Sequence, residues 1–145
     1  NAGVHIPHAV AYPVAGLVRD FVPAGYRTTK PLVPHGMSVI LTAPAAFRFT
    51  YPTAPERHLR AAELMGARVE GLSEAERREA LPRALAALMR DVGIPNGLSA
   101  IGYSERDVPA LIEGTLRQPR LLAGAPRAVG ASELDWILRD AMTCW

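Results

Sequence analysis

Apolar residues recur at intervals of three and four along much of the chain, which is the spacing of one face of an α-helix. The longest such stretch begins at Ser73 and stops at Gly93, and its apolar members are Leu81, Leu85, Leu88, Met89 and Val92. This spacing predicts a helix over residues 73–92. Pro82 either bends or splits that helix, because its ring removes one backbone donor. No segment shows a convincing alternation of apolar and polar residues, so the pattern predicts an all-α fold.

Proline and glycine divide the remaining chain into further elements. Pro55 and Gly66 bracket a short helix in the order expected of a helix start and end. Residues 35–49 are apolar and are interrupted by Pro44, which predicts one kinked buried helix or two short helices in line. Residues 19–33 carry several prolines, glycines and threonines and are expected to form a long irregular loop.

Three serine-led motifs indicate helix starts, at Ser73, Ser104 and Ser132. In each, the hydroxyl can accept a backbone N–H while an acidic side chain three residues later reaches back. The last motif opens a closing helix that carries Trp136. We expect Trp136 and Trp145 to be core anchors, and truncating a fully buried Trp136 to alanine would cost roughly 3–5 kcal/mol.

Composition excludes several classes of protein. The 145 residues suffice for one domain. Sixteen basic and fourteen acidic residues are spread along the chain, so neither a nucleic-acid surface nor a nucleic-acid partner is expected. The single Cys144 excludes an intrachain disulfide and a cysteine-based zinc cluster. No apolar run approaches the roughly 18 residues of a membrane span, so no membrane partner is expected.

Two histidines are candidates for metal binding. His8 lies between two prolines, and His35 lies between a proline and a glycine, so the backbone at each is restricted. Imidazole is the commonest neutral metal ligand in proteins, but a stable divalent site needs at least three protein donors. His8 and His35 are therefore half of a metal site at most, and the residues alone also permit two structural histidines.

His5, His8 and Tyr12 follow a spacing of three and four, which places them on one face of a helix that would face a cleft. We expect His5 to line that cleft without binding metal. Tyr12 is expected to hydrogen-bond the substrate rather than ionise, given a reference pKa near 10. The alternative for each is a satisfied polar side chain. His58, among charged neighbours at residues 56–60, is interpreted as structural on a solvated helix face.

Several motifs resemble one enzyme family. They are NAGVHIPHAVAYP at residues 1–13, PLVPHGMSV at 31–39, PERHL at 55–59, GYS at 102–104, DVPAL at 107–111 and GTL at 114–116. Together they resemble the C-terminal half of the iron-containing alcohol dehydrogenases. The resemblance implies an all-helical domain, here residues 1–145, as the fragment of a longer enzyme whose absent N-terminal Rossmann-like domain binds NAD(P).

The resemblance also implies a ligand set. In the family a divalent metal, usually Fe²⁺ with Zn²⁺ as the alternative, is held by one Asp and three His in the cleft between the domains. The matching positions are His8 and His35, and the other two ligands are expected upstream. Tyr12 stands where many members have a further histidine near the substrate. That departure is typical of the branch that transfers hydride between a hydroxyacid and a 2-oxoacid.

The implied activity is hydride transfer between an alcohol or a 4-hydroxybutyrate-like hydroxyacid and a nicotinamide cofactor or 2-oxoacid. Alternatives are a simple NAD-dependent alcohol dehydrogenase, a maleylacetate-reductase-like enzyme, and a non-catalytic helical interaction domain. Arg19, Arg27 and Lys30 are candidate cations for a substrate carboxylate. Alone, the chain is expected to be inactive. Its expected partners are its own N-terminal domain and a small-molecule substrate, and a homo-oligomer is allowed. The expected compartment is the cytoplasm, or the mitochondrion in a eukaryote.

Overall fold

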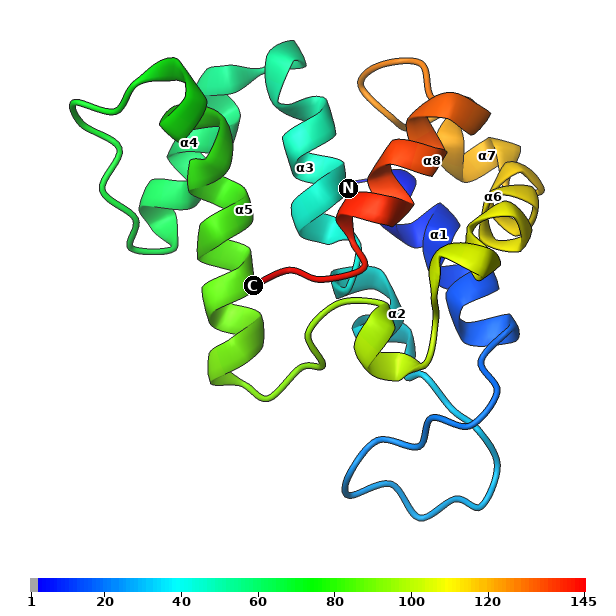
Figure 1. Ribbon diagram of the computed structural model, residues 1–145. Helices are drawn as coiled ribbons and strands as arrows, with labels where there is room; N and C mark the ends of the chain where they lie inside the picture. The colour runs from blue at the N-terminus through cyan, green and yellow to red at the C-terminus, as the bar shows by residue number, and fades with distance from the viewer. Residues whose placement is uncertain (1–2) are drawn as a thin grey trace.

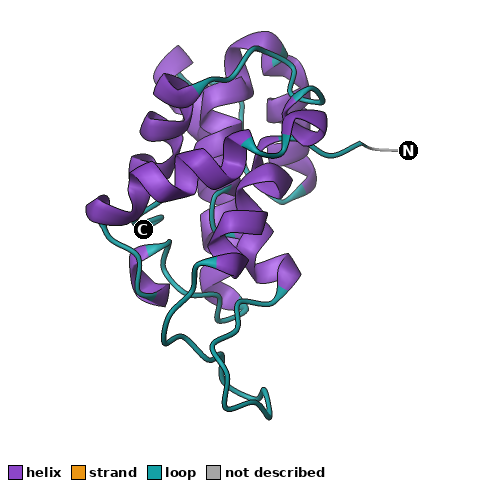
Figure 2. Ribbon diagram, turned by 90° about the vertical axis from the view of Figure 1, so that its right-hand side faces the viewer, coloured by secondary structure: helices purple, strands orange, loops and turns teal. Residues whose placement is uncertain are grey.

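The computed structural model describes residues 3–145 as a packed set of helices, with no strand in that range (Figures 1 and 2). The α-helices are α1 Ile6–Gly16, α2 His35–Ile40, α3 Ala43–Thr50, α4 Pro55–Leu64, α5 Glu74–Asp91, α6 Val108–Leu116, α7 Pro119–Leu122 and α8 Ala131–Asp140. Three 3-10 turns, η1 Tyr51–Thr53, η2 Ser99–Ile101 and η3 Glu105–Asp107, join them. The all-α prediction is confirmed. Across 3–145, no helix is long and apolar enough to span a bilayer.

Helix α1 is the central element. Its sequence is apolar on most sides, and it packs against α2, α6 and α7. Its buried residues are Ile6, Pro7, Ala9, Val10, Ala11, Pro13 and Val14. A Cβ atom on Gly114 of α6 would lie 2.6 Å from Cβ of Pro13. Only glycine therefore lets α6 cross α1 this closely.

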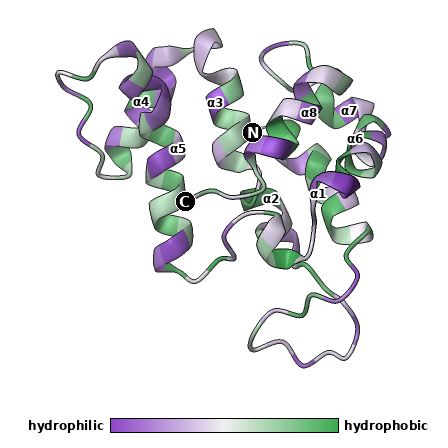
Figure 3. Cartoon of the chain, viewed as in Figure 1, coloured by the Kyte–Doolittle hydropathy of each residue, from purple (hydrophilic) through white to green (hydrophobic). Residues whose placement is uncertain are grey.

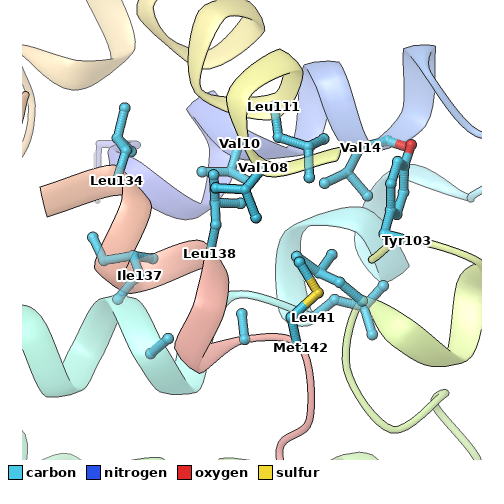
Figure 4. Packing of buried hydrophobic residues seen from close by; sticks show 14 of the residues in the cluster. Val10, Val14, Leu41, Tyr103, Val108, Leu111, Leu134, Ile137, Leu138 and Met142 are labelled. Atoms are coloured by element: carbon cyan, nitrogen blue, oxygen red, sulfur yellow. The ribbon is translucent and has the colours of Figure 1, made fainter. Parts of the chain in front are cut away.

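Two groups of apolar side chains form the interior. The main core joins α1, α6, α8 and the start of α3 (Figure 4), and its largest fully buried members include Ile6, Leu41, Leu98, Leu111, Leu134, Ile137 and Leu138. A smaller cluster lies between α4 and α5 and consists of Leu59, Ala62, Ala80 and Leu81. Helix α4 buries only Leu59 and Ala62 and is otherwise largely hydrophilic (Figure 3).

Arg48 of α3 links the two groups. Its Nε and Nη2 atoms each donate to a carboxylate oxygen of Glu79 in α5 at 2.7 Å, and its Nη1 pairs with Asp140 of α8. The Arg48 guanidinium holds the pKa of Glu79 below its usual value, chiefly through these hydrogen bonds. A half-buried bidentate pair of this kind fixes orientation more firmly than an exposed ion pair.

The helix over residues 73–92 is confirmed. Ser73 caps α5, with Glu76 donating its backbone N–H to the serine hydroxyl and accepting from the serine backbone N–H. Pro82 lies inside the continuous helix and does not split it. Residues 35–49 form two helices, and the chain breaks at 41–42 so that Pro44 falls in the first turn of α3.

Two expectations for the C-terminal part of the chain, the burial of its tryptophans and the start of α8, are wrong. Trp136 and Trp145 expose 39% and 42% of their surface, so neither is a buried anchor and the large truncation cost does not apply. Leu134, Ile137 and Leu138 fill the core-facing positions of α8 instead, and Trp136 falls off that face. The helix begins one residue before Ser132, and its cap is the backbone N–H of Gly130, which donates to Glu133 at 2.9 Å.

The segment before η2 holds the last residues of the chain. The Asn96 side chain accepts hydrogen bonds from the backbone N–H groups of Cys144 and Trp145, at 2.8 and 3.1 Å. Beside it, Gly97 has φ +76° and lies so close to the tail that a Cβ atom would stand 2.4 Å from the Met142 carbonyl oxygen. The last residues are therefore held by the Asn96 side chain and by close contact with the backbone of Gly97.

Candidate metal centre

His8 and His35 lie on two helices that pack against each other. His8 is in the first turn of α1, after Pro7, and is half-buried. His35 is the first residue of α2, after Pro34, and is exposed. The centroids of their rings are 5.7 Å apart, and the ring planes are inclined at 56°. The structure therefore brings together the two histidines that the sequence motifs single out.

The separation of the rings suits a shared metal ion. A nitrogen lies about 2.1 Å from a bound metal and about 1.2 Å from its own ring centre, so two imidazoles on one ion have centroids at most about 6.6 Å apart. At a tetrahedral angle the same lengths give about 5.4 Å, close to the 5.7 Å in the chain. The distance between the two ring centres is therefore within the range that a shared divalent ion allows.

The pair offers at most two donors, one imidazole from each histidine. Within residues 3–145, no group of three or more His, Cys, Asp or Glu side chains is placed to hold an ion. Because a stable site needs at least three protein donors, the geometry is that of an incomplete centre.

Tyr12 follows His8 by one helical turn and exposes 57% of its surface. Tyr12 and His35 line the same pocket, of about 420 Å³. The other lining residues are Ala11, Ala15, Gly16 and Val33. A space of this volume, with small apolar walls and two polar side chains, is suited to a small organic molecule.

His5 caps α1 rather than lying in it, since the helix begins at Ile6. The predicted common helix face therefore holds for His8 and Tyr12 but not for His5. The His5 ring meets Phe47 of α3 edge-on, with centroids 5.9 Å apart, and its Nδ1 is buried without a hydrogen-bond partner in the described part of the chain. Burial lowers the pKa of His5, and His8 and His58 lower it further, which favours a neutral ring.

His58 has both ring nitrogens occupied. Nδ1 lies 2.9 Å from the Ala54 carbonyl oxygen and Nε2 lies 3.0 Å from the Thr50 hydroxyl, which fits an Nδ1–H donor and an Nε2 acceptor. Its structural role is confirmed. Its position on a solvated face is wrong, because the ring is half-buried beside Phe47 and Tyr51.

Arg19 is engaged within the chain. It donates to the carboxylate of Asp107 and to the carbonyl of Gly102, so it is poorly placed to bind a substrate carboxylate. Arg27 and Lys30 lie in the loop between α1 and α2 and are not among the residues that line the Tyr12 pocket. The sequence did not indicate that Arg19 bonds to Asp107 and Gly102, because these residues meet Arg19 only when the chain folds.

These observations define a class: a helical domain that brings two histidine rings together at one end of a helix pair, near a pocket of a size for a small molecule. The chain belongs to the Fe-containing alcohol dehydrogenase family, since residues 1–142 match the model of its C-terminal part. The resemblance carried by the histidine motifs is thereby confirmed.

Curated relatives agree with this assignment. The chain is 42% identical over 142 residues to the hydroxyacid-oxoacid transhydrogenase, mitochondrial, of Rattus norvegicus, covering 98% of this chain and 30% of the relative. It is 44% identical to the Homo sapiens protein of the same name, with the same coverage. The chain thus spans about a third of the length of these relatives.

Solved structures share the fold. A 1,3-propanediol oxidoreductase superposes with a TM-score of 0.75 at 30% identity, over 93% of this chain and 32% of that one. An alcohol dehydrogenase from Oenococcus oeni superposes with a TM-score of 0.77 at 26% identity, over 94% of this chain and 32% of that one.

Proposed function

We propose that this chain is the C-terminal metal-binding part of an iron-dependent oxidoreductase. The full protein transfers hydride between a hydroxyacid of the 4-hydroxybutyrate type, or another alcohol, and a nicotinamide cofactor or 2-oxoacid. The observation that carries the proposal is the 5.7 Å approach of the His8 and His35 rings. The names of the relatives from Rattus norvegicus and Homo sapiens support hydroxyacid and oxoacid substrates. Family membership favours an enzyme over a non-catalytic interaction domain.

The side chains divide the work. His8 and His35, as neutral imidazoles, hold the ion, with Fe²⁺ as the first choice and Zn²⁺ as the alternative. A bound divalent ion supplies Lewis acidity, which lowers the pKa of a substrate hydroxyl and polarises a carbonyl in the reverse direction. Tyr12 donates a hydrogen bond to a substrate oxygen in the pocket that it shares with His35. His5 forms the cleft wall beside His8 without binding the ion.

The rest of the site belongs to the longer protein. An N-terminal domain would bind NAD(P) and supply one Asp and one His to the ion, as the family resemblance implies. That domain and a small-molecule substrate are the proposed partners. For the compartment we propose the cytoplasm or, in a eukaryote, the mitochondrion, in line with the names of the relatives.

The ligand assignment is tested in the full-length protein with His8→Ala and His35→Ala. Each variant should lose both iron, measured by elemental analysis, and turnover. His58→Gln is the matched control, because His58 is bonded within the domain, and it should retain iron. Wild-type iron content in either ligand variant would remove that histidine from the centre.

The reaction is tested with 4-hydroxybutyrate in the presence and absence of 2-oxoglutarate and of added nucleotide. Turnover that requires the oxoacid and no free nucleotide supports transhydrogenation on a retained cofactor. Turnover with free NAD and no oxoacid identifies a simple dehydrogenase instead. The isolated domain should show neither activity nor stoichiometric iron.

A further inference from the structure

Arg19, just past the end of α1, bonds to residues on both sides of η3: Gly102 before it and Asp107, its last residue, next to the start of α6. Its Nη1 lies 2.7 Å from Oδ1 of Asp107, and its Nη2 lies 2.6 Å from the carbonyl oxygen of Gly102. The guanidinium also sits over the Tyr103 ring, 5.7 Å from its centroid. We call Arg19, Gly102, Tyr103 and Asp107 the Arg19 clasp.

Two of the three partners of Arg19, Asp107 and Tyr103, are themselves fixed by further hydrogen bonds. The Asp107 carboxylate accepts from the backbone N–H and the hydroxyl of Ser104, at 2.7 and 3.0 Å. The buried Tyr103 hydroxyl donates to the carbonyl oxygen of Val14 at 2.7 Å. The hydrogen bonds from Arg19 and Ser104 lower the pKa of Asp107 to about 2, and burial raises the pKa of Tyr103 to about 12. The clasp is therefore in one charge state across the physiological range, and it holds α1 at Val14 and again just past the helix end.

The clasp stands at the base of the loop that leads to His35. Residues 17–34 leave the body of the molecule and return to it, at the lower right of Figure 1. At the neck of this loop, the Leu32 backbone N–H donates to the Phe21 carbonyl at 2.8 Å. Val33 is 2% exposed in the main core, directly before Pro34 and His35. The path to His35 is thus held at the clasp, at the neck and at Val33.

We propose that the Arg19 clasp is a positioning device for the metal centre, keeping the ring of His35 opposite that of His8. The inference rests on the proposed function of that pair. Ligands that are held in place before binding give up less conformational freedom when the ion arrives, so they bind it more tightly. Without the clasp, the path to His35 keeps only the restraints at the neck and at Val33, and we expect the His35 ring to sample more positions.

The test uses full-length protein and measures the dissociation constant for Zn²⁺ and Fe²⁺ by equilibrium dialysis with elemental analysis. Arg19→Ala should weaken metal binding about tenfold, the lower end of what loss of support around a metal ligand costs. Arg19→Lys keeps the charge and can still reach Asp107, so it should recover most of the affinity. Arg27→Ala removes the same charge from another position of the same loop and should bind as the wild type does.

Ser73→Ala distinguishes a positioning role of Arg19 from a general effect on stability. This change removes the cap of α5, which packs on α3 and α4, and lowers the melting temperature away from the centre. If Arg19→Ala weakens metal binding no more than Ser73→Ala does at an equal loss of melting temperature, the clasp does not position the ligands. Loss of metal in His8→Ala and His35→Ala, together with full affinity in Arg19→Ala, would overturn the clasp alone. Retained metal in both histidine variants would overturn the proposed function and the clasp with it.

Discussion

Tyr12, one helical turn beyond His8, limits the chemistry that its position in the site can perform. A phenol carries one hydroxyl that donates a hydrogen bond, whereas an imidazole carries two ring nitrogens that can pass a proton between them. The Tyr12 side chain is exposed in the pocket that it shares with His35. Position 12 is therefore suited to hold a substrate oxygen by a hydrogen bond and not to relay a proton.

Tyr12→Phe tests this role in the full-length protein. The change removes one hydrogen bond to the substrate, which is worth about 1–1.5 kcal/mol, and kcat/KM should fall about tenfold. Metal content, measured by elemental analysis, should not change, because Tyr12 is not a ligand in this proposal. An unaltered kcat/KM would exclude the hydroxyl from substrate binding.

His8 and His35 could be predicted because proline and glycine restrict the backbone around them, whereas the position of Trp136 depends on the register of α8. A family motif also marks each histidine, and their rings do converge. The convergence itself depends on the packing of α1 against α2, which local sequence does not encode. Trp136 was misplaced because a large apolar side chain was assigned to the core without regard to register. Leu134 and Ile137 define the buried face of α8.

At the scale of elements, Gly97 decides how closely the segment before η2 approaches the chain end. Its φ of +76° is unfavourable for other residues, and the Met142 carbonyl oxygen occupies the place of a side chain. Gly71 has nearly the same φ, +72°, but a Cβ atom added there would have no neighbour within 4 Å. A comparison of alanine substitutions at the two glycines therefore separates the cost of backbone strain from the cost of steric overlap.

Gly97→Ala should lower the free energy of unfolding by roughly 2–4 kcal/mol, because strain and overlap add. Gly71→Ala, with strain alone, should cost about 1–2 kcal/mol. Urea denaturation followed by circular dichroism measures both. Equal losses in the two variants would show that the tail moves aside without cost.

Element boundaries were predictable where the signal is local. The Ser73 cap and the φ of +75° at Gly93 bound α5, and residues 73–93 alone carry that information. For the break between α2 and α3, Pro44 indicated an interruption but did not distinguish a kink from two helices or place it at Leu41 and Thr42. Both residues are fully buried in the packed domain, so tertiary contacts fix the break.

At the scale of the whole molecule, acid stability reports the clasp. The pKa of Asp107 in the folded chain is about 2, below the ordinary value of 3.8. A carboxyl whose pKa is lowered on folding stabilises the fold above its unfolded pKa, and this stabilisation disappears as the pH falls through the folded pKa. Wild type should therefore exceed Asp107→Asn in free energy of unfolding by a constant amount above about pH 5.

That advantage should shrink between about pH 4 and pH 2. Urea unfolding of both proteins at a series of pH values measures it. A difference that stays constant down to pH 2 would contradict an ionised Asp107 held by Arg19. The sequence alone did not predict this pair, because the two residues are distant in the chain and meet only when η3 packs on the end of α1.

The position of Arg48 bears on how the domain loses its structure. One guanidinium ties α3 to Glu79 on one side and to Asp140 on the other, and the small α4–α5 cluster also leans on Phe47 of α3. If the α4–α5 cluster or the main core unfolded alone, the half-buried Arg48 guanidinium would lose the carboxylate of Glu79 or of Asp140. Unfolding of the main core or of the α4–α5 cluster alone is therefore unfavourable, and we expect thermal unfolding of the domain to be a single cooperative transition.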